Sequence, residues 1–310
     1  MPTAAQIAEA VLTPSLPVFL IGLLILVGGP LLLHTILAAS STYTTAPTIL
    51  LLGPDSAGKT ALVTLLERGT KPAQTHTSQV VQAVELNATT DASTKGSFRN
   101  HADATGTYTK FLLVDTPGHG KLRNLAMGKL SRTERLKGVV FMVDAAALGE
   151  RERDGAASGG GGGGLAATAE YLYDVLLHLQ QKRARGRGSG SGSGSGSGKG
   201  RNNAAVLPVL VAANKMDLFT ALPANLVRAQ LERELSRIRA SRSKGLLDSG
   251  VGVDEIGSEE QDAWLGEYGS DKFTFEQMVE FDIEVEVLGG SVTTDEADVD
   301  KWWWWMSSRV

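Results

Sequence analysis

The chain has 310 residues and a formal net charge of −4, from 30 basic and 34 acidic side chains. This length allows one sizeable domain with its own hydrophobic core. Because there is no basic surplus, nucleic acid is not expected as a direct ligand. The sequence has no cysteine, which excludes disulfides and cysteine-bound metals, and its five histidines lack the spacing of a metal site.

An uncharged apolar segment lies near the N-terminus. No Asp, Glu, Lys or Arg occurs from Ala10 to Pro54, and 18–39 is a stretch of 22 mostly apolar residues. As a helix it would be about 33 Å long, which is enough to span a bilayer. We therefore predict a transmembrane helix at 18–39 after a short lumenal segment at 1–17. A buried core helix or a cleaved signal peptide is the alternative, although a signal peptide should begin with basic residues and only Glu9 is charged here.

A phosphate-binding loop follows the first predicted strand. The apolar run 48–52 leads into Gly-Pro-Asp-Ser-Ala-Gly-Lys-Thr at 53–60, and a helical pattern follows at 61–68. In such a loop the glycines let backbone N–H groups point at phosphates, the lysine reaches the outer phosphates, and the threonine hydroxyl ligates magnesium. The predicted nucleotide-binding residues are Gly53, Asp55, Ser56, Ala57, Gly58, Lys59 and Thr60, with Thr60 also a metal ligand.

A guanine-recognition motif follows a second buried strand. The apolar run 206–212 leads to Asn214-Lys215-Met216-Asp217, an N-K-x-D box. A carboxylate on Asp217 can accept hydrogen bonds from the N1–H and the exocyclic amine of guanine, whereas adenine would leave it unpaired. Asn214, Lys215 and Asp217 therefore predict GTP as the nucleotide. The alternative is an Asn and an Asp that only cap a helix after the strand.

Between these motifs, a third strand ends in a D-x-x-G sequence. The run 111–114 precedes Asp115-Thr116-Pro117-Gly118. We expect Asp115 to hold Mg²⁺ through a water molecule and the Gly118 N–H to sense the γ-phosphate. The same four residues also suit an ordinary turn, so this prediction depends on the two other motifs.

With these motifs in this order, the chain resembles small GTPases of the Arf and Sar group, and most closely the β-subunit family of the signal recognition particle receptor. The resemblance is carried by Pro117-Gly118-His119 with Lys121-Leu122-Arg123, the strand 138–144, and the segments 231–243 and 273–288. It covers about 47–306, apart from low-complexity insertions at about 151–164 and 182–203.

The resemblance implies a Ras-like α/β P-loop GTPase domain at 45–310. Such a domain has a mainly parallel six-stranded sheet with helices on both faces and nucleotide loops at the carboxyl ends of the strands. The implied ligands are GTP and Mg²⁺. The implied function is to anchor and regulate the receptor α subunit at the endoplasmic reticulum membrane, with indirect partnership with the signal recognition particle, ribosome and translocon.

The orientation of the predicted span follows from this function. No Lys or Arg lies close to either end of 18–39, so the positive-inside rule gives no orientation. GTP is cytosolic, and the GTPase domain should therefore face the cytosol while the N-terminus faces the lumen.

Three further site residues depend on the family pattern. His119 follows the D-x-x-G glycine, where receptor relatives place a histidine that orients the attacking water, and it is the predicted catalytic residue. Relatives continue with Glu where this chain has Gly120, which predicts slow hydrolysis. Thr77 is expected to complete the magnesium shell, with Thr75 as the alternative. Ser291 is expected to meet the guanine carbonyl through its backbone, unless this segment is an ordinary strand-end turn.

Three other functions remain open. An Arf/Sar-type vesicle transport GTPase would share the nucleotide motifs, but Pro2 replaces the glycine of a myristoylation signal. A non-hydrolysing membrane scaffold would hold GTP as a structural ligand. A P-loop ATPase is the third, and Asp217 argues against it.

The C-terminal run Trp302-Trp303-Trp304-Trp305 cannot be wholly buried in a helix, because consecutive helical positions are about 100° apart. Relatives in the family that the chain resembles have a single Trp in a helix at this place, so the resemblance implies that Trp302 packs against the sheet. Trp305, three positions further on, should share its face, and Trp303 and Trp304 should then point outward. Outward indoles favour the lipid headgroup zone or a partner's apolar patch, and a frayed tail is the alternative.

Overall fold

The computed structural model describes residues 16–40, 46–69, 75–88, 109–154, 164–188, 206–248, 264–270, 272–293 and 297–310. The chain divides into two compact units, Met1–Thr45 and Ala46–Val310.

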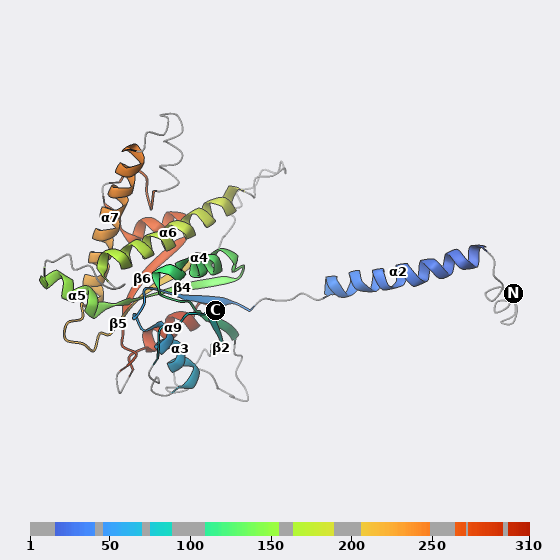
Figure 1. The fold of residues 1–310 in the computed structure, drawn as a ribbon, viewed down its shortest axis with the longest axis horizontal. Coiled ribbons are helices and arrows are strands. Elements are labelled where there is room, and N and C mark those ends of the chain that lie inside the picture. Colours follow the sequence, from blue (N-terminus) through green and yellow to red (C-terminus); the bar gives the residue numbers. More distant parts are fainter. Residues whose placement is uncertain are drawn as a thin grey trace. The chain divides into compact units, whose positions relative to one another are not determined.

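The described part of the first unit is a single helix, α2 (Leu16–Ser40), which coincides with the helix expected at 18–39 (Figure 1). Large apolar side chains between 19 and 33 are exposed, with Phe19, Leu24 and Leu26 as examples. Within the described part of the chain, no helix is both long enough and apolar enough to cross a membrane. The membrane span at 18–39 therefore stays a prediction.

The second unit contains a six-stranded sheet in the order β2-β3-β1-β4-β5-β6. The strands are β1 (Thr48–Leu52), β2 (Gln82–Ala88), β3 (Thr109–Asp115), β4 (Leu136–Asp144), β5 (Leu207–Asn214) and β6 (Ile283–Gly289). All neighbouring strands pair in parallel except β2, which runs antiparallel to β3 at one edge. The carboxyl ends of the five parallel strands therefore share one edge of the sheet, where their loops can meet.

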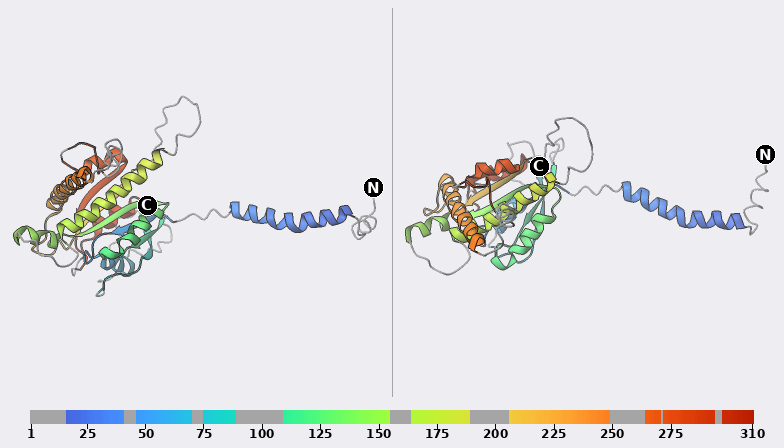
Figure 2. Two further views of the ribbon diagram at one scale, coloured as in Figure 1. Left: turned by 45° about the horizontal axis from the view of Figure 1, so that its top comes forward. Right: turned by 90° about the horizontal axis from the view of Figure 1, so that it is seen from above.

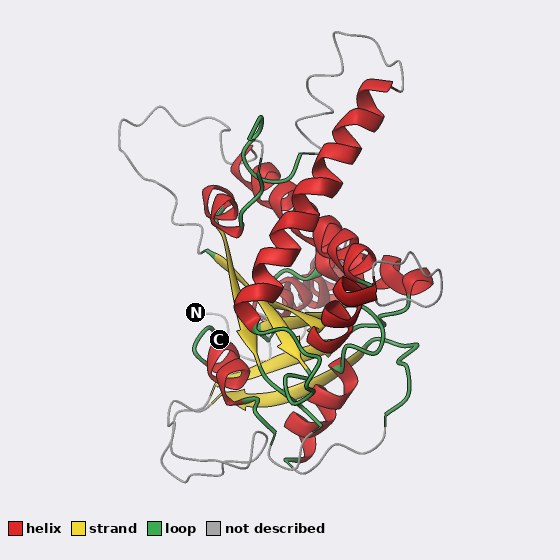
Figure 3. Cartoon of the chain, turned by 90° about the vertical axis from the view of Figure 1, so that its left-hand side faces the viewer, coloured by secondary structure: helices red, strands yellow, loops and turns green. Residues whose placement is uncertain are grey.

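Helices cover both faces of this sheet, as Figures 2 and 3 show. They are α3 (Lys59–Arg68), α4 (Arg123–Arg132), α5 (Ala145–Asp154), α6 (Leu165–Gly188), α7 (Ala224–Asp248) and α9 (Asp300–Ser307), with the short 3-10 helices η1 (Gly120–Leu122) and η2 (Phe275–Phe281).

Alternate residues of the central strands enter two separate hydrophobic cores. Leu50 and Leu52 of β1 pack on the side of α4, α5, α6, α7 and η2, whereas Ile49 and Leu51 pack on the side of α3 and α9. A strand that is covered on both faces has no solvent-facing positions, so its sequence is a continuous apolar run. This explains the TILLL of β1, and it confirms the predicted mainly parallel six-stranded sheet with helices on both faces.

The strand boundaries differ from the sequence prediction in a few places. The sequence does not predict the edge strand β2, because three of its seven residues are exposed and it has no apolar run. The last strand, β6, begins at Ile283, because η2 ends at Phe281 and Asp282 follows in a left-handed conformation with φ 57°. The helix α6 continues through 182–188, the first part of the insertion predicted at 182–203. Most of both predicted insertions, together with 1–15, lies outside the described residues.

The tryptophans of α9 are distributed nearly as predicted. Trp302 and Trp305 are buried, and the Trp302 indole N–H donates a hydrogen bond of 3.1 Å to the Leu288 carbonyl. Trp304 is 54% exposed. Trp303 is only partly exposed, because its ring packs 6.1 Å from that of Phe111 on β3, so its predicted outward position is wrong. The preference of the exposed indole for lipid or a partner stays a prediction.

Replacement of Trp302 by alanine should lower the free energy of unfolding of Ala46–Val310 by about 3–5 kcal/mol, because it removes a fully buried indole from the core between the sheet and α9. Trp304→Ala is the matched control and should change it by about 0.5 kcal/mol or less, since that ring is largely in solvent. Urea unfolding at a fixed nucleotide concentration measures both. Equal losses would contradict the described packing of α9.

Candidate nucleotide-binding site

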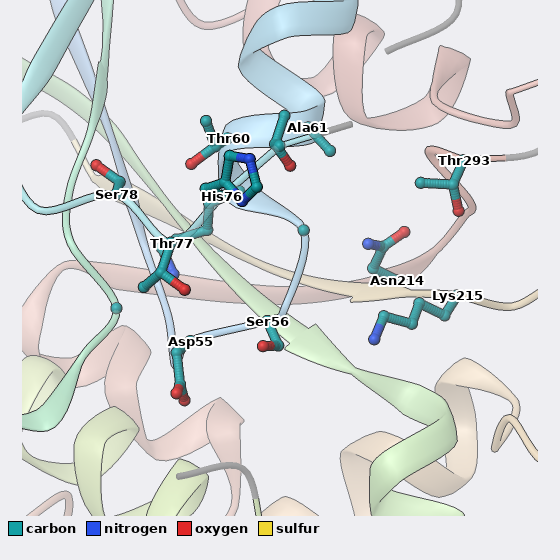
Figure 4. A pocket seen from close by; sticks show the side chains of 14 residues that line it. Asp55, Ser56, Thr60, Ala61, His76, Thr77, Ser78, Asn214, Lys215 and Thr293 are labelled. Atoms are coloured by element: carbon teal, nitrogen blue, oxygen red, sulfur yellow. The ribbon is translucent and has the colours of Figure 1, made fainter. Parts of the chain in front are cut away.

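A cavity of about 300 Å³ lies at the carboxyl edge of the sheet (Figure 4). It is lined by Asp55, Ser56, Gly58, Lys59, Thr60, Ala61, Thr75, His76, Thr77, Ser78, Gly118, Asn214, Lys215 and Thr293. These residues belong to the loop after β1 and the start of α3, the segment before β2, and the loops after β3, β5 and β6. The phosphate-loop, D-x-x-G and N-K-x-D sequences therefore meet at one cavity.

The loop after β1 requires its glycines. Gly53 and Gly58 have φ of 137° and 96°, and Ser56 also has a positive φ of 59°. A Cβ atom on Gly53 would lie 2.3 Å from the Met142 carbonyl oxygen, and one on Gly58 would lie 2.3 Å from Nδ2 of Asn214. The conformation and the close approach of neighbouring strands both exclude side chains at these two positions.

Lys59 is buried beneath this loop. Its Nζ donates hydrogen bonds to the carbonyl oxygens of Gly53 at 2.9 Å and Pro54 at 2.6 Å. Burial lowers the pKa of Lys59 to about 8, although the carboxylates of Asp115 and Asp55 oppose this shift. Two neutral carbonyls compensate a buried ammonium only in part, so an anion in the cavity would be a better partner.

Thr60 and Asp115 lie side by side in a position that suits a metal ion. The Thr60 hydroxyl donates a 2.7 Å hydrogen bond to Oδ2 of Asp115. Burial raises the pKa of Asp115, while Thr60 and Lys59 oppose this shift. Its Oδ1 is buried and has no hydrogen-bond partner among the described residues. An unsatisfied carboxylate oxygen beside a hydroxyl fits Mg²⁺, which prefers oxygen ligands.

The described residues include no cluster of three or more His, Cys, Asp or Glu that could hold a metal. A magnesium ion at Thr60 and Asp115 would therefore need further oxygens. Nucleotide phosphates commonly provide them, because Mg²⁺ in nucleotide sites is held by one or two carboxylates plus phosphate. The predicted ligand Thr77 lines the same cavity, as does its alternative Thr75.

The D-x-x-G loop packs directly on the phosphate loop. A Cβ atom on Gly118 would lie 2.4 Å from Nζ of Lys59 and 2.6 Å from the Pro54 carbonyl carbon, so only glycine fits here. The predicted catalytic His119 follows but is exposed and is not among the cavity-lining residues. Its Nδ1 accepts a 3.3 Å hydrogen bond from the Lys121 N–H at the start of η1. Its catalytic role stays a prediction.

The N-K-x-D box is attached to the phosphate loop by Asn214. The Nδ2 of Asn214 donates a 2.9 Å hydrogen bond to the Ala57 carbonyl, and its Oδ1 is buried without a partner among the described residues. Lys215 lines the cavity and forms a 2.5 Å ion pair with Asp144 at the end of β4. Asp217 is exposed and lies outside the cavity lining, which leaves its carboxylate accessible to a base.

The loop after β6 differs from expectation in the residue that reaches the cavity. The N–H of Ser291 donates a 3.1 Å hydrogen bond to the Asp298 carbonyl, and Ser291 is buried outside the lining. Thr293 lines the cavity instead (Figure 4). Sequence reasoning missed Thr293, as it missed His76, Ser78 and the partner role of Asp144. None of these has a local signal, because each acquires its place from contacts with distant segments.

A family model described as "Signal recognition particle receptor beta subunit" matches residues 44–186 and 199–281. The chain belongs to this family. The mouse receptor subunit beta is 31% identical over 198 residues, which cover 61% of this chain and 56% of the relative. The yeast (Saccharomyces cerevisiae) subunit is 26% identical over 201 residues, covering 64% and 61%. The chain thus spans about 56% of the length of the mouse relative and 61% of the yeast one.

Solved structures agree with this assignment. The receptor SRb-GTP/SRX complex from Chaetomium thermophilum is 38% identical with a TM-score of 0.60, over 86% of this chain and 100% of that one. The mammalian receptor is 26% identical with a TM-score of 0.53, over 85% and 100%. Both the predicted family and the predicted Ras-like GTPase fold are confirmed.

Binding of GDP with Mg²⁺ should be accompanied by proton uptake. With a pKa of about 8, Lys59 is about half neutral at pH 8 in the ligand-free domain. Phosphate beside Nζ favours the charged form, so binding raises this pKa and takes up about half a proton at pH 8, more at pH 9 and little at pH 7. Calorimetry in two buffers of different ionisation enthalpy measures the uptake.

The control for this experiment is Lys59→Arg, whose guanidinium stays charged at all these pH values. Its binding, even if weaker, should show no such pH-dependent uptake. The same uptake in this variant, or none in the unmodified chain, would contradict the assignment of the titration to Lys59.

Proposed function

We propose that the chain is the GTP-binding, membrane-anchored subunit of a signal recognition particle receptor, which holds and regulates the receptor α subunit at the endoplasmic reticulum. The observation that carries the proposal is the hydrogen bond from Asn214 to Ala57, because it joins the guanine-recognition box to the phosphate loop at one cavity. The exact pairing of a phosphate site with a guanine reader is typical of GTPases.

The proposed contacts follow from the cavity. The loop from Gly53 to Gly58 and the Lys59 ammonium would hold the phosphates, with the Gly118 N–H at the γ-phosphate. Thr60, Asp115 and Thr77 would hold Mg²⁺, which neutralises phosphate charge when it is bound. Asn214, Lys215 and Asp217 would hold the guanine. The loop that contains Ser291 and Thr293 would close over the base, and the lining position of Thr293 favours it for direct contact.

The partner proposal draws on the relatives. One solved relative is a complex of the receptor subunit with GTP and SRX, and another is the mammalian receptor. These structures support the proposal that this chain binds GTP and a receptor partner. We propose the receptor α subunit as the direct partner. Contacts with the signal recognition particle, ribosome and translocon would be indirect. The family match favours this function over vesicle transport.

Hydrolysis by the isolated chain should be slow. The described residues that line the cavity include no arginine, and His119 lies outside the lining. An efficient GTPase needs a positioned water and added positive charge at the transition state, often from an arginine of a partner. Single-turnover hydrolysis with and without the α subunit separates a regulated switch from a scaffold that only holds GTP.

Ala46–Val310 should bind GTP far more tightly than ATP, because Asp217 pairs with the guanine edge. Asp217→Asn should shift the preference toward xanthosine triphosphate, since the amide replaces an acceptor by a donor opposite the altered purine edge. Competition against a fluorescent guanine nucleotide measures both. Equal binding of ATP and GTP by the unmodified domain would overturn the nucleotide assignment.

We place the membrane anchor at 18–39 and the GTPase domain at 45–310 in the cytosol. The absence of charged residues from Ala10 to Pro54 and the exposed apolar side chains of α2 support the span. The cytosolic side of the domain follows from the cytosolic location of GTP. A helix with such a surface is unstable in water unless lipid or a partner covers it.

Deletion of Met1–Ser40 should therefore release the chain from carbonate-washed membranes and leave GTP affinity unchanged within about twofold, because the first residue of β1 is Thr48. Sedimentation of membranes that lack the α subunit measures release. Persistence of the truncated chain in the carbonate pellet would show that 18–39 is not the anchor.

A further inference from the structure

A cluster of basic residues lies at the end of the domain opposite the nucleotide loops, where the parallel strands begin. It consists of Lys129 and Arg132 in the last turn of α4, Arg135 and Lys137 at the start of β4, and Lys182, Arg183 and Arg185 near the end of α6. We call this surface the basic edge. Lys129, Arg132, Arg135 and Arg185 are exposed. Glu134 is the one acidic residue in the sequence from 129 to 137.

Hydrogen bonds bring the two parts of the basic edge together. Lys182 donates from Nζ to the carbonyl oxygens of Leu130, Ser131 and Thr133, at 2.9, 3.1 and 3.2 Å. These are the free carbonyls at the end of α4, where a cation is favoured. The contact fixes the end of α6 against the end of α4, and the two helices lie side by side in Figure 1. Residues about 50 positions apart in sequence thus form one surface.

The positive charges of this surface affect the pKa values of His178 and Lys182. Burial lowers the pKa of His178 on α6, and the charges of Lys182 and Arg185 lower it further. The pKa of Lys182 is also lowered, by burial and then by the charge of Arg183. Burial is the larger cause of both shifts, and the neighbouring positive charges act in the same direction.

The domain begins beside one residue of the basic edge. The Thr48 N–H donates a 2.9 Å hydrogen bond to the Arg135 carbonyl, and the Leu112 N–H donates one of 2.9 Å to the Pro47 carbonyl. Ala46 and Pro47 therefore reach the sheet beside Arg135. Only residues 41–45 separate Ala46 from the last residue of α2, and a segment of this length extends over at most about 21 Å.

We propose that the basic edge binds the anionic headgroups of the membrane in which 18–39 is anchored, and so holds the nucleotide loops toward the cytosol. The proposal rests on the proposed function for the anchor. A tether this short keeps the edge near the headgroups, whose negative potential attracts basic residues within about a Debye length, roughly 10 Å. No Lys or Arg lies close to the span in the sequence, and in this proposal the basic edge of the folded domain provides the positive charge.

The test uses Ala46–Val310, which is a compact unit that contains both hydrophobic cores. The domain should bind vesicles that contain about 30% phosphatidylserine and should not bind vesicles of phosphatidylcholine alone. Binding to the anionic vesicles should weaken as the salt concentration rises. Arg132→Gln with Arg185→Gln should weaken binding about 30-fold, since each cation near an anionic surface contributes about 1 kcal/mol. Vesicle sedimentation measures the partition coefficient.

The matched control is Arg237→Gln with Lys244→Gln, which removes two exposed charges from α7 and should change binding less than about twofold. Unchanged GTP affinity in both double variants shows that the domain remains folded. Equal losses in the two variants, or equal binding to neutral vesicles, would overturn the proposal. A further contrary outcome is that the Arg132 and Arg185 variant binds vesicles as well as the unmodified domain does but no longer binds an RNA duplex. The basic edge would then bind nucleic acid and not lipid, which would also overturn the proposal.

The outcome is independent of the anchor experiment. If the full chain is extracted by carbonate but the domain still binds anionic vesicles through the basic edge, the span is wrong and the basic edge is supported. If the full chain resists carbonate and the domain ignores anionic vesicles, the anchor stands and the basic edge is overturned.

Discussion

The parallel pairing of β1 with β3 and β4 is the constraint on which the site depends. Register places Leu51 beside Asp115, and Asp144 of β4 pairs with Asn214 of β5. The residues that follow the strands therefore emerge at one edge, close enough for Lys59 to lie beneath Gly118. The register is fixed by burial, because β1 and β4 insert alternate residues into two different cores and a slip of one residue would exchange them.

The cavity carries polar groups that the protein alone satisfies poorly. The ammonium of Lys59 donates its hydrogen bonds to the loop carbonyls of Gly53 and Pro54, while one oxygen each of Asp115 and Asn214 is buried without a partner among the described residues. Each such group costs free energy in the absence of a ligand. Functional sites often tolerate such unsatisfied groups. A ligand that pairs with them removes their cost, and the free energy recovered in this way adds to its binding affinity. The domain should accordingly be stabilised by its nucleotide.

The sequence by itself determined the family, the mainly parallel six-stranded sheet that the family implies, and the apolar strand and glycines of the phosphate loop. These features are encoded locally: the apolar run of β1 directly precedes the loop, and Gly53 and Gly58 are required by backbone conformations that other residues avoid. The family resemblance placed Trp302 against the sheet, and the helical period then predicted that Trp305 would be buried with it. A local pattern is sufficient wherever the physical requirement falls within a few residues along the chain.

Only the tertiary structure decided what depends on contacts between distant segments. Thr293 lines the cavity because the Ser291 N–H pairs with Asp298, and Trp303 is partly covered because Phe111 of β3 lies beneath it. The basic edge forms because Lys182 caps the end of α4. The physical reason is common to all three: a side chain's exposure and charge environment are set by the neighbours that packing supplies, and sequence spacing does not reveal neighbours many residues away.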